Sequence, residues 1–392
     1  MTTATGETLT TTRPGPAPHR GGVRSWAERN ATILGPFAAL LIMSVAFGLL
    51  APSFATAGNL WNVLSQVSVL AVLAAGLTFV LLLGQIDLGV ANIAVMTGVV
   101  VAVVYSGKPL TLPVVGDLTF GTGSVVPAVV IALVLAVALG LLAGWLTARL
   151  GIPSFIGTLG ILQVAQGLAF FWSGGNNIYD LPPIATKLGG GFTGPVPNIV
   201  ITAALVLVVC HVVLSRTRFG RYVYMTGANA RAAELSGVPV RRVTISVFVL
   251  SAVLAAFAGV LSVGRLGSAQ ANAGDELLLP AIAAVVLGGT SLFGGVGSML
   301  NTSVGLLLYG VLNNGLDQLN MNIYLKPFAR GAFLLLAIAF NIVALRIASR
   351  ARLQQALDDQ PDDVPARGSY ASGVVGPHRD LDAVAGAELG HQ

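Results

Sequence analysis

The chain has 392 residues, of which only 9% are charged, whereas soluble chains usually carry about 25%. Hydrophobic residues make up 55% of the chain and recur in long runs, and glycine occurs 48 times. This composition excludes an ordinary soluble protein. It predicts an all-α fold, a polytopic membrane helix bundle whose small residues let helix backbones approach closely. The net charge of +5 does not indicate nucleic-acid binding, because the basic residues lie between hydrophobic runs.

Long apolar runs follow one another along most of the chain. A hydrocarbon core about 30 Å thick requires roughly 20 apolar residues per helix, and on this measure we expect about ten transmembrane helices. The eighth is too short to cross alone. It either continues into the glycine-rich stretch after it or forms one half of a broken helix. The predicted spans are 33–50, 62–83, 88–105, 125–147, 154–172, 197–214, 243–263, 280–288, 298–316 and 328–345.

The spans define a transmembrane permease domain at 31–347, with tails on either side. Residues 1–30 and 348–392 are polar and rich in Pro and Gly, so we expect disordered cytoplasmic tails. A signal peptide is the competing interpretation at the N-terminus, because the Ala-Thr-Ala sequence at 55–57 resembles a cleavage site. The polar and apolar segments before it are both too long for a signal peptide. Between the third and fourth spans, 107–123 predicts a hairpin outside the membrane.

The basic residues determine the expected orientation, because short cytoplasmic loops retain Lys and Arg. With both termini in the cytoplasm, the basic residues inside clearly outnumber those outside. Most of the loop arginines lie in 215–242, which is therefore predicted to be cytoplasmic. The inside set is Arg13, Arg20, Arg24, Arg29, Arg149, Arg216, Arg218, Arg221, Arg231, Arg241, Arg242, Arg346, Arg350, Arg352, Arg367 and Arg379; the outside set is Lys108, Lys187, Arg265, Lys326 and Arg330.

The loop 215–242 has its own helix signals. Asn229 is a favourable N-cap, residues 230–235 are mostly strong helix formers, and Gly237 is a natural C-terminal stop. We therefore expect a short helix across the cytoplasmic face. The alternative is an ordinary positively charged loop without a specific role.

Asp87 is an ionisable residue between two long apolar runs, flanked by Gly84 and Gly89. Two interpretations remain open and are compatible with each other. In the first, Asp87 caps the next helix in a tight cytoplasmic turn. In the second, it belongs to a polar constriction that faces a central pathway.

Motifs for chemistry within the chain are lacking. A phosphate-binding loop of the Gly-x4-Gly-Lys-Ser/Thr type is absent, and Gly107 and Lys108 are followed by Pro109. The histidines are scattered without metal-ligand spacing, and Cys210, the single cysteine, lies in an apolar run. The sequence therefore predicts neither an enzyme nor a cofactor in this chain.

Several segments, taken together, carry a family pattern. The loop spacing Thr-x-Phe-Gly-Arg-x-x-Tyr-x-x-Gly-x-Asn-x-x-Ala-Ala-x-x-Ser-Gly is matched by Thr217, Phe219, Gly220, Arg221, Tyr224, Gly227, Asn229, Ala232, Ala233, Ser236 and Gly237. The other matching segments are GQIDL at 84–88, PSFIGTLG at 153–160, RLGSAQ at 265–270 and GGTSLFGG at 288–295. On these residues, the chain from about 60 to 338 resembles the permeases of ribose- and xylose-type sugar ABC importers, within the branched-chain-amino-acid/ribose permease superfamily.

This resemblance implies a type II ABC importer-like subunit in the bacterial plasma (inner) membrane. It implies a homodimer with a second permease copy, a cytoplasmic ABC ATPase that binds ATP and Mg, and an extracytoplasmic sugar-binding protein. The solute is then a monosaccharide such as ribose or xylose. The alternative functions are a stand-alone secondary transporter or channel for a small polar solute, and a non-transporting scaffold.

Three groups of site residues follow from the loop, the resemblance and the polar character of the spans. The expected ATPase-coupling residues are Arg221, Asn229, Ala232, Ala233, Glu234, Ser236 and Gly237. The expected translocation pathway contains Gln85, Asp87, Asn92, Gly288, Gly289, Ser291, Asn313 and Asn314, although helix packing is an equal alternative for the glycines. The expected binding-protein docking residues are Arg265, Lys326 and Arg330, for which ordinary interfacial anchoring is the alternative.

Overall fold

The computed structural model describes residues 31–112, 116–333 and 335. All of them belong to one compact unit, Met1–Ile338. Both predicted tails, the domain boundary at 347 and most of the tenth span lie outside the described residues. The helices are α2 (Ala31–Leu50), α3 (Ala57–Leu82), α4 (Val90–Tyr105), α5 (Val125–Ala148), α6 (Ser154–Ser173), α7 (Pro183–Gly190), α8 (Asn198–Arg216), α9 (Arg218–Ala228), α10 (Ala230–Leu235), α11 (Val240–Leu266), α12 (Asp275–Leu287) and α13 (Met299–Gln318).

The all-α prediction is confirmed, and each of the first nine predicted spans overlaps a helix. Five helices, α3, α5, α6, α8 and α11, are long and apolar enough to cross a membrane. Residues 326–333 are helical at the start of the tenth predicted span. The hairpin expected in 107–123 is present as an antiparallel pair, β1 (Leu110–Leu112) with β2 (Gly116–Leu118). A second short pair, β3 (Phe192–Thr193) with β4 (Val196–Pro197), precedes α8.

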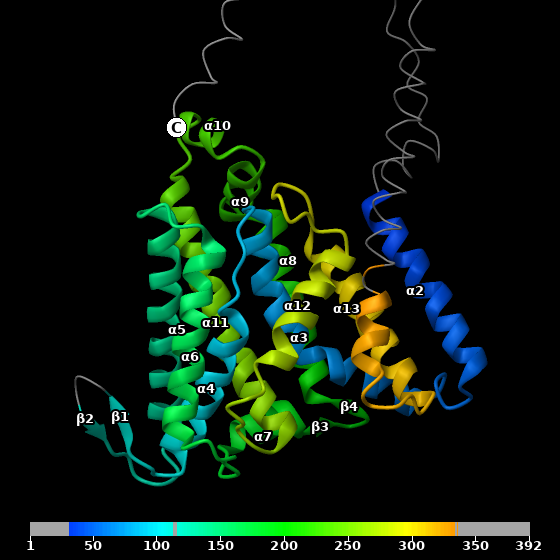
Figure 1. The fold of residues 1–392 in the computed structure, drawn as a ribbon, viewed down its shortest axis with the longest axis horizontal. Coiled ribbons are helices and arrows are strands. Elements are labelled where there is room, and N and C mark those ends of the chain that lie inside the picture. The colour runs from blue at the N-terminus through cyan, green and yellow to red at the C-terminus, as the bar shows by residue number, and fades with distance from the viewer. Residues whose placement is uncertain (1–30, 113–115, 334, 336–392) are drawn as a thin grey trace, which may run out of the picture. The chain divides into compact units, whose positions relative to one another are not determined.

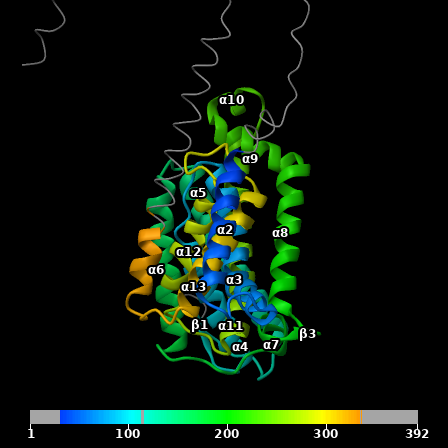
Figure 2. The same cartoon turned by 90° about the vertical axis from the view of Figure 1, so that its right-hand side faces the viewer.

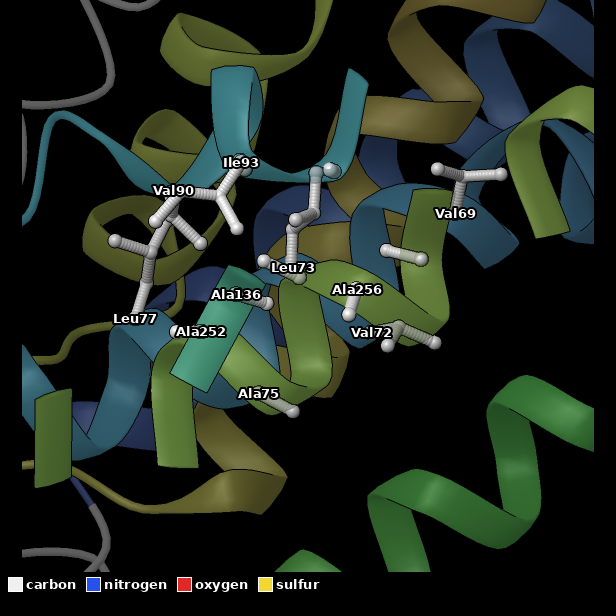
Figure 3. Packing of buried hydrophobic residues seen from close by; sticks show 14 of the residues in the cluster. Val69, Val72, Leu73, Ala75, Leu77, Val90, Ile93, Ala136, Ala252 and Ala256 are labelled. Atoms are coloured by element: carbon white, nitrogen blue, oxygen red, sulfur yellow. The ribbon is translucent and has the colours of Figure 1, made fainter. Parts of the chain in front are cut away.

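The core is built around α11, which packs against α3, α4 and α5. Its contacts are made by small and branched apolar residues such as Leu73, Ala136, Ala252 and Ala256 (Figure 3). A Cβ atom built on Gly144 of α5 would lie only 2.7 Å from the Cα atom of Ile245. The backbones of α5 and α11 therefore touch, as expected where van der Waals packing drives helix association.

Two crossings of the bundle are interrupted by non-helical backbone. After α3, the segment 84–89 runs back along the bundle before α4 begins (Figure 1). Likewise, 267–274 separates α11 from α12. At 1.5 Å per residue, the 16 residues of α4 and the 13 of α12 reach only about 24 Å and 20 Å. Neither helix is long enough to span the hydrocarbon core alone, and α12 ends at Leu287 without continuing as a helix into the glycine-rich stretch after it.

The two ends of the bundle carry different structures (Figures 1 and 2). We call them the α9–α10 end and the opposite end. The loop 288–298 lies beside α9, and the Ala31 end of α2 lies at the same level (Figure 1). The opposite end carries α7 and the short strands.

Candidate functional site

Helix α9 was missed by the sequence analysis. The side chain of Thr217 caps it, because its Oγ1 accepts a hydrogen bond from the backbone N–H of Gly220 at 3.2 Å. Gly220, Val223 and Thr226 form its buried side. Their spacing of three residues is a helical signal, and with the Thr217 cap it would have predicted α9.

Helix α10 is the short helix that the loop sequence predicts. The Oδ1 atom of Asn229 accepts a hydrogen bond from the backbone N–H of Ala232 at 3.0 Å. At the other end, Gly237 adopts φ +83° and donates to the carbonyl of Glu234, and Val238 donates to the carbonyl of Ala233. These bonds satisfy backbone groups that would otherwise be unpaired, so α10 is a defined element at both ends.

The exposed surface of α10 differs in one residue from the expected docking set. Ala232, Glu234, Ser236 and Gly237 are exposed, and so is Arg221 on α9. Ala233, in contrast, is 3% exposed. Its methyl group packs into this chain and is not available for docking, which corrects the expected surface.

Leu235 is a residue of this surface that the sequence analysis did not include. It is 84% exposed at the last position of α10. The sequence of α10 does not show which way this leucine points, because a helix of six residues is too short to have a clear apolar stripe. With Glu234, it makes α10 a surface with one apolar and one acidic feature.

The C-terminal part of α9 is joined to α3 and to the loop 288–298 through backbone groups. A Cβ atom on Gly227 would overlap the carbonyl oxygen of Leu82, which already accepts a hydrogen bond from Gly295 at 2.9 Å. The hydroxyl of Tyr224 donates to the carbonyl of Gly297 at 2.8 Å. Burial raises the pKa of this hydroxyl, which keeps it protonated as a donor at neutral pH.

Three expected pathway residues lie in this loop or at its start. A Cβ atom on Gly288 would overlap the carbonyl of Asn301 in α13, and Gly289 adopts φ +97°. Ser291 donates its backbone N–H to Val296 at 2.8 Å, and its Oγ accepts from Phe293 at 3.1 Å. Gly288 thus permits close packing on α13, while Gly289 and Ser291 shape the loop.

The interrupted segment 84–89 holds Asp87 inside the bundle. Its carboxylate is 3% exposed and accepts hydrogen bonds from Ser251 Oγ at 2.9 Å and from the backbone N–H of Gly89 at 3.0 Å. The hydroxyl oxygens of Ser154 and Thr158 in α6 accept hydrogen bonds from the backbone N–H groups of Ile86 and Leu88, respectively, each at 3.0 Å.

This geometry separates the two interpretations of Asp87. Asp87 is not the capping residue of α4, because the N-cap is Gly89 and no side chain caps this helix; the carboxylate accepts a hydrogen bond from the N–H of Gly89 instead. The tight surface turn is also wrong, because Gly76, which lies six residues before the end of α3, touches Ser251. At 1.5 Å per residue, Ser251 and its partner Asp87 therefore lie about 9 Å along the bundle from the end of α3.

Gln85 and Asn92 border the same region. Gln85 is half-buried, and its backbone donates to Val80 at 3.1 Å. Asn92 is buried, and its Nδ2 donates to the carbonyl of Leu162 in α6 at 3.4 Å. A Cβ atom on Gly274 would overlap Asn92 Oδ1, so the beginnings of α4 and α12 meet here.

Asn313 and Asn314 lie elsewhere, near the start of α3. Asn314 is fully buried and accepts a hydrogen bond from Asn59 Nδ2 at 2.8 Å, so it links α13 to α3. Asn313 is half-buried and points toward Gln66, with 3.5 Å between its Nδ2 and Gln66 Oε1. The expected pathway residues therefore form three separate groups.

Only one of the three basic residues expected to dock a binding protein is exposed. Arg265 is exposed and donates to the carbonyl of Gln66 at 3.3 Å. Lys326 forms a salt bridge with Asp317 in this chain, and Arg330 donates to the hydroxyl of Tyr309 at 3.2 Å. These partners are remote in sequence or on another helix, so the sequence alone did not reveal them.

Comparisons with known proteins agree on one family. A family model described as "Branched-chain amino acid transport system / permease component" matches residues 59–338. The chain is 36% identical to the ribose import permease protein RbsC of Escherichia coli (strain K12) over 319 residues, 80% of this chain and 94% of that protein.

Two other relatives are similarly complete. The chain is 38% identical to RbsC of Bacillus subtilis (strain 168) over 79% of this chain and 92% of that protein. It is 33% identical to the L-arabinose ABC transporter permease protein AraH of Azospirillum brasilense, over 83% of this chain and 91% of that protein. No solved structure gives a significant match.

Proposed function

The chain belongs to the branched-chain amino acid transport system / permease component family, and from this premise we propose that it imports a monosaccharide. It is a multi-pass ABC permease subunit and not itself an enzyme. Such a subunit carries no cofactor, because ATP binds to a partner ATPase, and a binding protein delivers the solute.

The choice of solute class rests on the named relatives. Their printed names include ribose and L-arabinose, both pentoses, and each of those proteins is covered over nine-tenths of its length or more. A pentose is the solute class that we propose to test first. Uptake of labelled ribose, arabinose and xylose by the assembled transporter, each in competition with the others, measures the preference.

Helix α10 is the observation that carries the coupling proposal. It is capped at both ends, exposes Ala232, Glu234 and Leu235, and is attached through α9 to the end of α3. A short helix with satisfied ends moves as a rigid body, which a flexible loop does not do. We therefore assign docking on the ATPase to α10, with Arg221 beside it and with Asn229, Ser236 and Gly237 holding its ends.

We place the α9–α10 end in the cytoplasm, with both termini on that side. The C-terminal ends of α5 and α8 bring Arg149 and Arg216 to this end, and α9 and α10 add Arg218, Arg221 and Arg231. Short cytoplasmic loops are enriched in such residues. The membrane is then the bacterial plasma (inner) membrane.

We propose a homodimer with the translocation pathway between two copies. In this arrangement Gln85, Asp87 and Asn92 act as a buried polar gate beside the pathway rather than as its open lining, because Asp87 and Asn92 are covered in one copy. Irregular backbone is tolerated at membrane depth only where protein or water covers it.

Arg265 remains the proposed binding-protein contact at the opposite end.

Charge reversal of Glu234 tests the coupling assignment. We expect Glu234→Lys to reduce sugar-stimulated ATP turnover of the assembled transporter about tenfold or more, since a contact charge is replaced by its opposite. Asp180→Lys, at an exposed position in the loop before α7, is the matched control. The permease–ATPase affinity, measured for both variants, should fall in Glu234→Lys and stay unchanged in Asp180→Lys. Undiminished turnover in the Glu234→Lys transporter would contradict the assignment. Uptake by the chain without any ATPase would instead support a stand-alone transporter.

A further inference from the structure

Among the residues that the structure describes, Phe293 is the most exposed large apolar side chain at the α9–α10 end. It is 93% exposed, and its neighbours Leu292 and Val296 are 43% and 53% exposed. We propose that the loop 288–298 is a second docking point for the ATPase subunit, with Phe293 as an apolar anchor on the loop that packs against the C-terminal part of α9. This inference rests on the proposed function, in which an ATPase approaches this end.

The loop is in contact with α9, the helix that leads into α10. Gly294 lies so close to α9 that a Cβ atom on it would be 2.8 Å from the carbonyl oxygen of Gly227. A Cβ atom on Gly295 would lie 3.0 Å from the Cα atom of Ala228, the last residue of α9. Tyr224 adds the hydrogen bond to Gly297. A partner that binds α10 would therefore also approach this loop, because both are attached to α9.

The tip of the loop has a defined shape. Ser291 and Val296 close it with a backbone hydrogen bond of 2.8 Å, and Phe293 donates its N–H to Ser291 Oγ. Gly289, Gly294, Gly295 and Gly297 adopt positive φ values, which residues with side chains rarely adopt. A preorganised loop loses little conformational entropy on binding, so its apolar tip suits an anchor role.

The exposed residues of the α9–α10 end indicate what a complementary partner surface would contain. Phe293 and Leu235 are the two apolar projections, at 93% and 84% exposure. Arg218 and Arg221 of α9 and Arg231 of α10 are exposed at the same end, as is Glu234 of α10. We therefore infer a partner with apolar depressions and a rim that carries acidic groups for the arginines and a basic group for Glu234, the arrangement in which buried anchors provide affinity and rim charges provide orientation.

The loop also connects the docking surface to Asp87. A Cβ atom on Gly84 would lie 3.0 Å from the carbonyl oxygen of Phe293, and Gly84 begins the segment that contains Asp87. Movement of the ATPase against Phe293 would be transmitted to this segment across one backbone contact. A movement of the ATPase could then be transmitted to the segment 84–89 by two routes, one through Phe293 and one through α9 and the end of α3.

Truncation of Phe293 tests this second contact. The probe is the ATPase subunit purified from the assembled transporter, and its affinity is measured for the full chain in nanodiscs. We expect Phe293→Ala to weaken binding about tenfold, which is about 1.4 kcal/mol, and Phe293→Trp to restore most of it, because truncation removes the apolar anchor and Trp replaces it. Phe192→Ala, at a phenylalanine 69% exposed on β3 at the opposite end, should have no effect.

Photocrosslinking identifies what covers the side chain. With p-benzoylphenylalanine at position 293 in the full chain, we expect crosslinks to the ATPase subunit. Crosslinks to lipid alone, or unchanged affinity in Phe293→Ala, would overturn the inference. If Glu234→Lys uncouples the transporter while Phe293→Ala binds normally, the second contact fails and the proposed function stands. If the unaltered chain binds no ATPase, the proposed function itself fails.

Discussion

At the scale of single residues, Asp87 shows how a carboxylate is accommodated in an apolar bundle. Burial of an isolated charge is costly unless hydrogen bonds compensate it. Here Ser251 and the backbone N–H of Gly89 both donate to the carboxylate. The group therefore holds α11 to the segment 84–89, and its loss would leave two buried donors without their acceptor.

Substitution of Asp87 should reveal this role. We expect Asp87→Ala to lower the free energy of unfolding by about 1–3 kcal/mol for each donor left unpaired, and Asp87→Asn to cost less because its amide oxygen still accepts. Thermal unfolding of the purified chain in detergent measures the effect. The control is Asp317→Asn, which removes a partly exposed salt bridge worth at most about 1 kcal/mol. Equal midpoints for Asp87→Ala and the native chain would contradict the assignment.

The cap of α10 is a second feature at this scale. Asn229→Ala removes the hydrogen bond to Ala232, and the lost cap should destabilise α10 by about 1 kcal/mol. We expect faster amide hydrogen exchange at 230–235 together with a lower ratio of sugar imported to ATP hydrolysed. Asn198→Ala is the comparison, because Asn198 begins α8 without a side-chain cap to that helix. An unchanged exchange rate in α10 would show that the cap does not maintain it.

At the scale of elements, the contact between α5 and α11 depends on two glycines. Cβ atoms on Gly140 and Gly144 would each lie 2.7 Å from atoms of α11. Without these glycines the two helices would have to move apart along their whole contact. This explains part of the high glycine content of the chain, in addition to glycines that are needed for positive φ angles.

Single methyl groups test this packing. We expect Gly144→Ala to destabilise the chain by about 1–3 kcal/mol, since overpacking forces backbone shifts. Gly160→Ala, in α6 where a Cβ atom meets nothing within 4 Å, should be neutral or slightly stabilising. The midpoint of thermal unfolding distinguishes the two variants. Equal midpoints for both would mean that α5 and α11 can separate without cost.

The interrupted crossings are the second feature at this scale. The segment 84–89 is not helical, and side chains of α6 accept hydrogen bonds from two of its backbone N–H groups. Membrane helices tolerate such irregular backbone only where neighbours re-satisfy the freed groups. The sequence indicated a break through its glycines, but the partners Ser154 and Thr158 lie about 70 positions away in the chain.

At the scale of the whole molecule, the orientation in the membrane is open to direct test. Cys210 is 5% exposed and the only cysteine, so Cys210→Ala provides a background without thiols. In that background we expect an impermeant maleimide to label Tyr179→Cys in intact cells, and Ser236→Cys only after permeabilisation. Both positions are exposed, at opposite ends of the bundle. The reverse labelling pattern would invert the proposed topology.

The sequence by itself determined the membrane class, the family and the existence of α10, because these depend on composition and on local signals such as Asn229 and Gly237. Only the tertiary structure decided which side chains are free to contact a partner and which are buried or paired within the chain. Ala233 faces inward, Asn314 links two helices, and Lys326 is paired with Asp317. The reason is physical: local helix signals act over a few residues, whereas burial and hydrogen bonding depend on residues brought together from distant parts of the chain.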